Sequence, residues 1–194
     1  MRRISIVGTS CSGKTTLARA LAVRLGLPCV ELDTLFWGPR WTPVPDDVFL
    51  DRVARALDGE AWVVDGGYAK LDQLKLGRAD TVIWLDYPMR TVLARWARRT
   101  VRRIRSQEEF WPGTGNRESL RNALRRDGLL AWILTTHRRR RESMEARMRA
   151  WPGLHWIRLR SPAEADQWLA SVPLVVGGGT AAPLGASSIG QNDA

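Results

Sequence analysis

The segment Gly8-Thr9-Ser10-Cys11-Ser12-Gly13-Lys14-Thr15 has the residue types and spacing of a phosphate-binding loop, G-x-x-x-x-G-K-[ST]. Its glycines allow the backbone to wrap closely around phosphate oxygens, so that amide N–H groups and the start of a following helix face the anion. We expect Lys14 to reach the β- and γ-phosphates of a nucleotide and the Thr15 hydroxyl to bind Mg²⁺. Cys11 is interpreted as a small loop filler rather than an oxidisable thiol.

Carboxylates follow several short apolar segments and can complete such a site. Asp65 follows the apolar run 61–64 and precedes two glycines, so we expect it to orient Mg²⁺ through water, with an ordinary Asp-Gly turn as the alternative. Asp33 is interpreted as a base for an acceptor hydroxyl or as a second metal-side carboxylate, and the alternative is a helix or turn cap. Asp86 precedes Tyr87-Pro88 and is expected to cap the helix that follows.

The elements that must position these residues alternate along the chain. Apolar runs predict short buried strands at 4–7, 29–32, 61–64, 81–85 and 155–159. Helical patterns separate them at 15–25, 46–57, 88–105, 117–150 and, after a capping box that begins at Ser161, 162–171. This alternation predicts an α/β fold with a parallel sheet covered on both faces. Ligands in such sheets bind at the carboxyl ends of the strands, where the loop and the carboxylates fall.

Composition excludes several classes of protein. The 194 residues, 44% of them hydrophobic, suffice for one domain with a packed core. No apolar run approaches the roughly 20 residues of a transmembrane helix, the start lacks signal-peptide features, and two cysteines make no disulfide framework. We therefore expect a cytoplasmic protein. Its domain is predicted at 1–172, and the Gly-, Ala-, Ser- and Pro-rich segment 173–194 is predicted to be a disordered tail.

The net charge of +10 comes from one segment of the chain. Between Pro88 and Arg149 there are 17 Arg, no Lys and 6 acidic residues, a balance of +11, whereas the rest has 13 basic and 14 acidic residues. The spacing of Arg95, Arg98, Arg99 and Arg102 predicts one charged helix face. Such a segment suits the phosphates of a nucleic acid or of a small phosphorylated molecule.

These features resemble the P-loop nucleoside and nucleotide kinases of the adenylate kinase superfamily. The chain is most similar to the bacterial branch labelled topology modulation protein or adenylate kinase-like. Besides the phosphate loop, the resemblance is carried by 31–37 (ELDTLFW), 41–45 (WTPVP), 62–68 (WVVDGGY), 79–88 (ADTVIWLDYP) and 157–162 (IRLRSP). It covers about residues 3–171.

The resemblance implies a three-layer P-loop NTPase fold with a five-stranded parallel sheet and a mobile, Arg-rich helical lid at about 98–141. In such kinases the lid closes over ATP, excludes water and supplies guanidinium groups to the transferring phosphoryl. The lid candidates here are Arg99, Arg103, Arg117 and Arg138. The turn Ser161-Pro162 falls where related kinases place the adenine. The implied ATP-binding residues are Gly8, Thr9, Ser10, Cys11, Ser12, Gly13, Lys14, Thr15, Thr16, Ser161 and Pro162.

The implied function is a kinase, an ATP- and Mg²⁺-dependent phosphotransferase acting on a small-molecule or nucleotide acceptor. Lys14, Asp33 and the lid arginines would be catalytic, with Thr15 and Asp65 on the metal. Adenylate kinases carry Asp-Gly-Phe-Pro-Arg after the third strand, where this chain has the segment 65–70 (DGGYAK), so the resemblance assigns no acceptor. Trp37 and Trp41 are candidates for stacking against the acceptor, with loop packing as the alternative. The alternative function is an ATP-regulated nucleic-acid-binding protein that modulates DNA topology.

Overall fold

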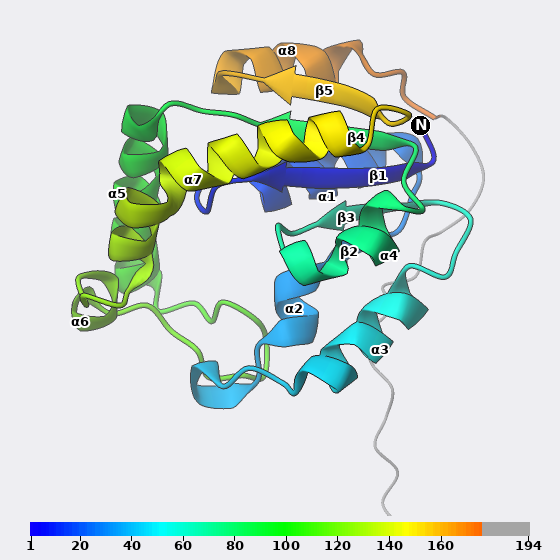
Figure 1. Ribbon diagram of the computed structural model, residues 1–194. Helices are drawn as coiled ribbons and strands as arrows, with labels where there is room; N and C mark the ends of the chain where they lie inside the picture. The colour runs from blue at the N-terminus through cyan, green and yellow to red at the C-terminus, as the bar shows by residue number, and fades with distance from the viewer. Residues whose placement is uncertain (176–194) are drawn as a thin grey trace, which may run out of the picture.

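The computed structural model describes residues 1–175, so the predicted disorder of 176–194 lies outside the described part of the chain. A parallel sheet of five strands forms the centre of the molecule (Figure 1). Its strands are β1 (Arg3–Gly8), β2 (Cys29–Glu31), β3 (Trp62–Asp65), β4 (Thr81–Leu85) and β5 (His155–Leu159), in the spatial order β2-β3-β1-β4-β5. All neighbouring strands pair in parallel, which confirms the predicted five-stranded parallel sheet.

Helices cover both faces of the sheet. The long ones are α1 (Lys14–Leu25), α3 (Asp46–Ala56), α5 (Met89–Ser106), α7 (Leu129–Ala150) and α8 (Pro162–Ser171). The short ones are α2 (Leu32–Phe36), α4 (Asp72–Leu76) and α6 (Leu120–Ala123). In Figure 1, α7 crosses in front of the sheet and α1 lies behind it, while α5 stands beside the sheet. This is the three-layer arrangement that alternating strands and helices produce.

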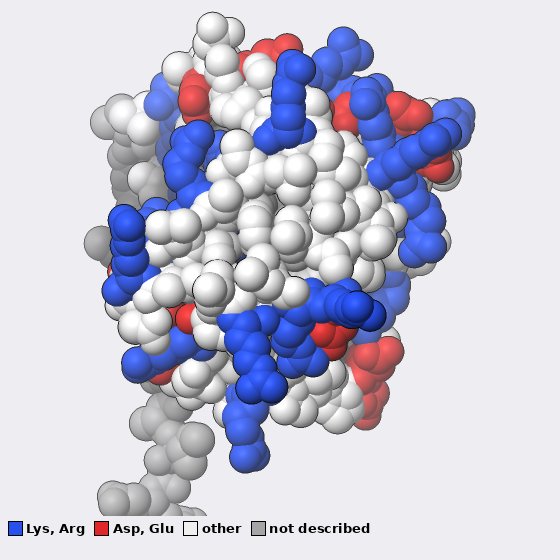
Figure 2. Space-filling model, turned by 90° about the vertical axis from the view of Figure 1, so that its left-hand side faces the viewer, with Lys and Arg blue, Asp and Glu red and all other residues white. Residues whose placement is uncertain are grey.

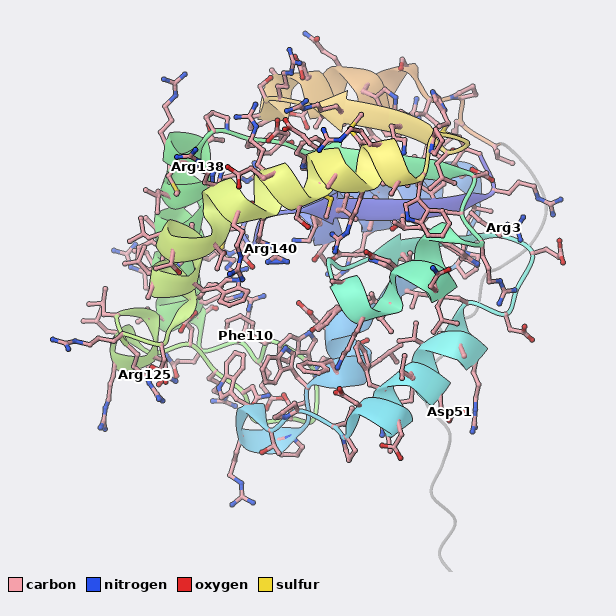
Figure 3. All side chains as sticks on the ribbon, in the orientation of Figure 1. Arg3, Asp51, Phe110, Arg125, Arg138 and Arg140 are labelled. Carbon is pink, nitrogen blue, oxygen red and sulfur yellow. The ribbon has the colours of Figure 1, made fainter. Side chains whose placement is uncertain are left out.

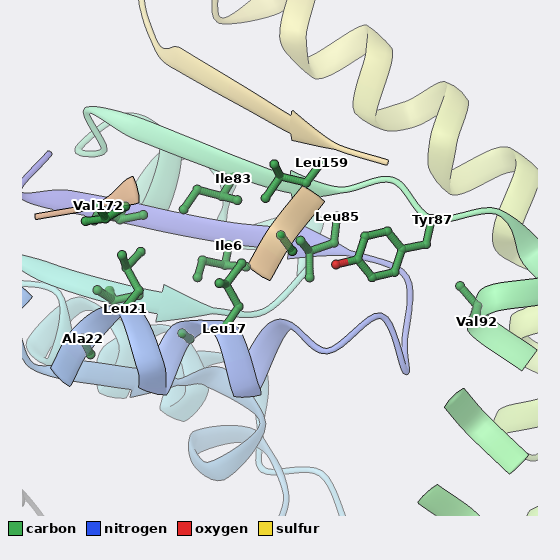
Figure 4. Close-up of a cluster of buried hydrophobic side chains, with 14 of the residues drawn as sticks. Ile6, Leu17, Leu21, Ala22, Ile83, Leu85, Tyr87, Val92, Leu159 and Val172 are labelled. Atoms are coloured by element: carbon green, nitrogen blue, oxygen red, sulfur yellow. The ribbon is translucent and has the colours of Figure 1, made fainter. Parts of the chain in front are cut away.

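The core follows from the alternation of side chains along each strand. Ile6, Ile83 and Leu85 face α1 and α8 and form one buried cluster with Leu17 and Leu21 (Figure 4). The side chains between them face the opposite way. On that face Val7, Val82 and Trp84 pack with Met144 of α7, while Trp62 and Val64 pack with Phe49 and Val53 of α3. Both faces of the sheet are therefore apolar, as a buried parallel sheet requires.

Several elements differ from the sequence-based expectation. The predicted strand 29–32 ends at Glu31, because buried Leu32 begins α2 and the Thr34 hydroxyl donates to the Glu31 carbonyl oxygen at 2.6 Å. The helix predicted over 117–150 is divided into α6 and α7. Ser119 caps α6 by accepting from the Asn122 N–H at 3.1 Å, and a turn through Gly128 separates the two helices.

Asp86 does not cap α5, which was the prediction for it. Pro88 holds the cap position, and the buried Asp86 carboxylate instead accepts from Arg158 Nε and Nη2 at 2.9 and 2.7 Å. Arg141 Nη2 of α7 lies 3.2 Å from the same carboxylate. Asp86 thus joins β4, β5 and α7. No helix among residues 1–175 combines the length and apolar character needed to span a membrane.

Candidate active site

The phosphate loop connects β1 to α1 at the carboxyl edge of the sheet. Gly8 has a φ of +154°, and a Cβ there would lie 2.8 Å from the Leu85 carbonyl oxygen, so only glycine lets the loop leave β1 beside β4. The Ser12 N–H donates to the Thr9 carbonyl oxygen at 3.1 Å and closes the turn. Lys14 Nζ donates to the same oxygen at 3.2 Å, which holds the ammonium over the loop. The loop therefore has the compact form that surrounds a phosphate.

Asp65 and Thr15 meet next to this loop. Asp65 ends β3 and is buried, and its Oδ2 accepts a hydrogen bond from the Thr15 hydroxyl. The other oxygen, Oδ1, is buried and has no hydrogen-bond partner among the described residues. Burial raises the pKa of Asp65, and the nearby Lys14 ammonium and the Thr15 hydrogen bond oppose that rise. The sequence placed these two residues in one metal site, and the fold brings them into contact.

These donors fit Mg²⁺. The residues 1–175 hold no group of three or more His, Cys, Asp or Glu side chains that could form a metal site alone. Mg²⁺ in nucleotide sites usually takes one or two protein oxygens and completes its octahedron with waters and phosphate oxygens. The Thr15 hydroxyl and the partnerless Oδ1 of Asp65 are such a partial set. Their arrangement matches a metal that arrives with a nucleotide.

Asp33 lies in the first turn of α2, and Tyr68 reaches it from the segment after β3. The Tyr68 hydroxyl donates to Asp33 Oδ1 at 2.7 Å. Burial and then the Asp33 carboxylate raise the pKa of Tyr68, which keeps the phenol protonated and therefore a donor. Asp33 itself is exposed. Its second oxygen is therefore accessible to a ligand, while Tyr68 fixes its orientation. Sequence reasoning missed Tyr68, although its place three residues after Asp65 was visible.

The predicted charged face of α5 has an inward and an outward edge. Arg95, Arg99 and Arg103 recur every four residues and face the phosphate loop. A Cβ on Gly13 would collide with the Arg95 guanidinium, and both Arg99 and Arg103 act electrostatically on Cys11. Arg98 and Arg102 line a shallow groove on the outward side. The four arginines of the predicted face lie within about 100° of the helix circumference. Arg95 and Arg99 form its half-buried edge, and Arg98 and Arg102 form its exposed edge.

The inward arginines have unsatisfied donors. Arg99 Nε and Arg103 Nη1 are buried with no hydrogen-bond partner among residues 1–175. The Arg103 guanidinium lies 3.6 Å from the centre of the Phe110 ring, which supports it from the lid segment. Burial and then the neighbouring Arg99 lower the pKa of Arg103 to about 10, and Glu118 partly offsets this. Cations left without partners beside a phosphate loop are suited to bind an anion there.

Two of the predicted lid arginines lie on the surface instead. Arg117 Nη2 is 3.9 Å from Glu109 Oε1 on the neighbouring stretch of the lid segment. Arg138 Nε is 3.0 Å from Glu142 Oε1, and its side chain is 94% exposed. Arg140 is half-buried on the other side of the same helix (Figure 3). Nothing in the run 138–141 identifies which arginine faces inward, because that depends on how α7 packs.

The lid segment contacts the segment after β2 through an aromatic cluster. The Trp37 and Trp111 rings stack with centres 6.2 Å apart, and Phe110 packs edge-on against Trp41 at 4.7 Å. Buried Asn116 also joins the two segments, since its amide donates to the Gly38 carbonyl oxygen and accepts from the Trp41 N–H, both at 2.9 Å. Trp37 and Trp41 thus pack on Trp111 and Phe110, which agrees with the packing alternative rather than with stacking against an acceptor.

Ser161-Pro162 opens α8 at the carboxyl end of β5. The Ser161 hydroxyl accepts from the Glu164 N–H at 3.1 Å, which is one half of the predicted capping box. The Glu164 carboxylate accepts from the N–H of Arg160, one residue before the N-cap, instead of from that of Ser161. Burial raises the pKa of Tyr87 to about 12, with a smaller opposing effect from Arg95 and small contributions from Asp166 and Glu164. The start of α8 is therefore close to Tyr87, at the same edge of the sheet as the phosphate loop.

Solved structures similar to this chain include P-loop small-molecule kinases. A sugar kinase from Janibacter sp. HTCC2649 is 19% identical, with a TM-score of 0.49 over 88% of this chain and 93% of that chain. A gluconokinase from Sinorhizobium meliloti 1021 is 20% identical, with a TM-score of 0.47 over 87% and 91%. A shikimate kinase from Bacteroides thetaiotaomicron is 13% identical, with a TM-score of 0.48 over 87% and 94%. No protein-family model matches this chain, and no curated protein does. Its activity must therefore be argued from its own site residues.

Proposed function

We propose that the protein is a phosphotransferase that moves the γ-phosphoryl group of ATP, with Mg²⁺, to a small acceptor. The observation that carries this proposal is the position of the partnerless Arg99 and Arg103 donors over a complete phosphate loop. A loop that only bound a nucleotide would need Lys14 and its amides. Additional buried guanidinium groups serve the charge that spreads over a transferring phosphoryl group.

Separate groups of residues would hold the phosphates, the metal ion and the adenine. The phosphate loop and Lys14 hold the β- and γ-phosphates, and Thr15 with Asp65 holds Mg²⁺, which neutralises charge on those phosphates. Ser161 and Pro162 begin α8 at the edge where the adenine would lie. The inward arginines of α5 face the phosphate loop. With the rest of the proposed lid they exclude water from the reacting group. This assignment retains Arg99 and Arg103 as catalytic residues and replaces Arg117 and Arg138 with Arg95.

The transfer step forms one P–O bond and breaks another. An acceptor hydroxyl oxygen donates a lone pair to the γ-phosphorus and forms the new P–O bond. The bond from that phosphorus to the β–γ bridging oxygen breaks, and its electron pair leaves with ADP. The hydroxyl proton passes to the Asp33 carboxylate, which Tyr68 holds in place through the 2.7 Å hydrogen bond. Asp33 thus serves as the base.

A transfer assay tests the proposal. Purified full-length protein is incubated with labelled ATP, Mg²⁺ and a panel of hydroxylated metabolites and nucleotides, and the labelled products are separated. Lys14→Ala should abolish transfer, and Arg103→Met should lower kcat about 100-fold, the usual effect of removing one donor to the reacting group. Arg102→Met, one residue away on the outward side, is the matched control and should retain activity. ATP hydrolysis without transfer to any acceptor would contradict the proposal.

The outward face of α5 supports a second candidate function, the binding of nucleic acid. Arg98, Arg102 and Arg105 have no hydrogen-bond or ion-pair partner among the described residues and line the shallow groove with Val101. Figure 2 shows basic side chains around an uncharged area on this side of the molecule. Binding to duplex DNA should then weaken steeply with salt. Equal DNA affinity after replacement of all three arginines by alanine would exclude this function.

A further inference from the structure

Arg140 of α7 lies near the proposed site, but it belongs neither to the phosphate loop nor to the inward arginines of α5. A Cβ on Gly67 would lie 3.0 Å from Arg140 Nη2, so the guanidinium lies against the glycine turn after β3. Arg140 also lines a small pocket with Gly8 and Thr9 of the phosphate loop. Figure 3 shows its side chain on the side of α7 that faces the centre of the molecule. It therefore reaches the phosphate loop and the turn after β3 from α7.

The Arg140 guanidinium has no anionic partner within residues 1–175. Its neighbour Arg141 pairs with Asp86, and Arg138 pairs with Glu142, whereas Arg140 forms no hydrogen bond and no ion pair. Burial is the main cause that lowers the pKa of Arg140, and the Asp33 carboxylate and Tyr68 oppose it. The Trp132 ring, whose centre lies 5.8 Å from the guanidinium, is uncharged and supplies no counter-charge. A half-buried cation without an anionic partner is unfavourable unless a ligand supplies the missing negative charge.

The position of Arg140 distinguishes its ligand from ATP. The phosphates of ATP already have Lys14 and the three inward arginines of α5. Arg140 instead lies at the Gly67 turn, within the electrostatic influence of the Asp33 carboxylate, the residue proposed to accept the proton of the acceptor hydroxyl. A single acceptor molecule would meet both residues. Guanidinium groups prefer the paired oxygens of a carboxylate or a phosphate, which they bind through two parallel hydrogen bonds.

We infer that the acceptor carries an anionic group, a carboxylate or a phosphate, which Arg140 binds while Asp33 takes the hydroxyl proton. This inference rests on the proposed phosphotransferase function and specifies its substrate class. The anion would lie between α7 and the turn after β3, beside Tyr68. The glycine at position 67 leaves room for this anion, since a side chain there would occupy the space next to the Arg140 guanidinium.

Matched acceptors test this inference with the full-length protein. Glucose, gluconate and glucose 6-phosphate form such a set, because all three keep free hydroxyl groups and differ in the anionic group. We expect the anionic members to be phosphorylated with a kcat/KM at least about 100-fold above that of the neutral member, since loss of a charge-assisted bidentate contact has an effect of this order. Comparison of gluconate with glucose 6-phosphate shows which anion Arg140 takes.

Variants of α7 identify the residue. Arg140→Gln should raise the KM for the anionic acceptor about tenfold or more and change the KM for ATP less than about twofold. Arg140→Lys should recover part of the loss. Arg139→Gln, at the exposed neighbouring position, is the control and should match the wild type. Calorimetric titration of the acceptor, with a non-hydrolysable ATP analogue bound, measures the same change without turnover.

The outcomes separate the inference from the proposed function. Equal transfer to neutral and anionic acceptors would overturn the inference and leave the phosphotransferase intact. A higher KM for ATP with an unchanged KM for the acceptor in Arg140→Gln would also overturn it, because the guanidinium would then serve the γ-phosphate. Bound ATP with no transfer to any acceptor would instead refute the phosphotransferase itself.

Discussion

Replacing Lys75 by methionine should remove a rise in stability between pH 7 and pH 10. Lys75 in α4 is fully buried at 0% exposure, and its Nζ donates to the Gly66 carbonyl oxygen at 2.8 Å. Its nearest carboxylate oxygen, on Asp72, is 3.8 Å away and is shared with Arg147, which lies 2.7 Å from the other oxygen of Asp72. Burial therefore dominates and lowers the pKa of Lys75 to about 8 from 10.5.

The lowered pKa of Lys75 sets the direction and size of the change in the free energy of unfolding with pH. Between pH 8 and 10.5 the unfolded chain binds the Lys75 proton more tightly than the folded chain, so the free energy of unfolding rises with pH. The lowered pKa corresponds to a penalty of roughly 3 kcal/mol below pH 8. Roughly 1 kcal/mol of it remains at pH 10, so the free energy of unfolding rises by roughly 2 kcal/mol between pH 7 and pH 10.

Urea denaturation followed by tryptophan fluorescence at pH 7 and pH 10 measures this change. The cysteines and tyrosines titrate in the same range, so the informative quantity is the difference between wild type and Lys75→Met at each pH. That difference should shift by roughly 2 kcal/mol in favour of the wild type as pH rises. Lys70→Met, at an exposed lysine, is the control. Parallel pH profiles for wild type and Lys75→Met would refute the reasoning.

Three further predictions concern the metal, the lid and the core. Asp65→Asn should raise the Mg²⁺ concentration for half-maximal activity about tenfold with an unchanged circular dichroism spectrum, and an identical magnesium titration would count against the metal role. Asn116→Leu removes two hydrogen bonds to the segment 38–41, so it should lower the free energy of unfolding by about 2 kcal/mol, measured by urea titration. Phe49→Ala, at a side chain with no exposure, should lower it by about 3–5 kcal/mol, whereas Leu50→Ala on the exposed side should change it little.

The strands and the phosphate loop could be predicted because their patterns are local. Five apolar runs indicated five strands within one or two residues, and G-x-x-x-x-G-K-[ST] has a meaning only between a strand and a helix. The contact between Thr15 and Asp65 also followed, since the carboxyl ends of parallel strands share one edge of the sheet. The short helices α2 and α4 were missed, because tertiary burial of Leu32 and Lys75 rather than a long periodic pattern positions them.

The arginines mark the limit of sequence reasoning. Composition alone showed that 88–149 carries the whole excess charge, and the resemblance to P-loop kinases gave that segment the role of a lid. Which guanidinium groups face the site was decided by the packing of α5 and α7 against each other and against the loop. Arg138 and Arg140 differ by two residues, or about 200° around a helix, and lie on opposite sides of it.

The sequence by itself therefore determined the fold class, the phosphate loop and the sign and location of the charge, because each is encoded in residues close together in the chain. Arg99 and Arg103 were among the four candidates named from the sequence, but only the tertiary structure separated them from Arg117 and Arg138 and added Arg95 and Arg140. It did so because the direction in which a helix presents a side chain depends on what the helix buries. What a helix buries is decided by contacts between residues that are far apart in the chain.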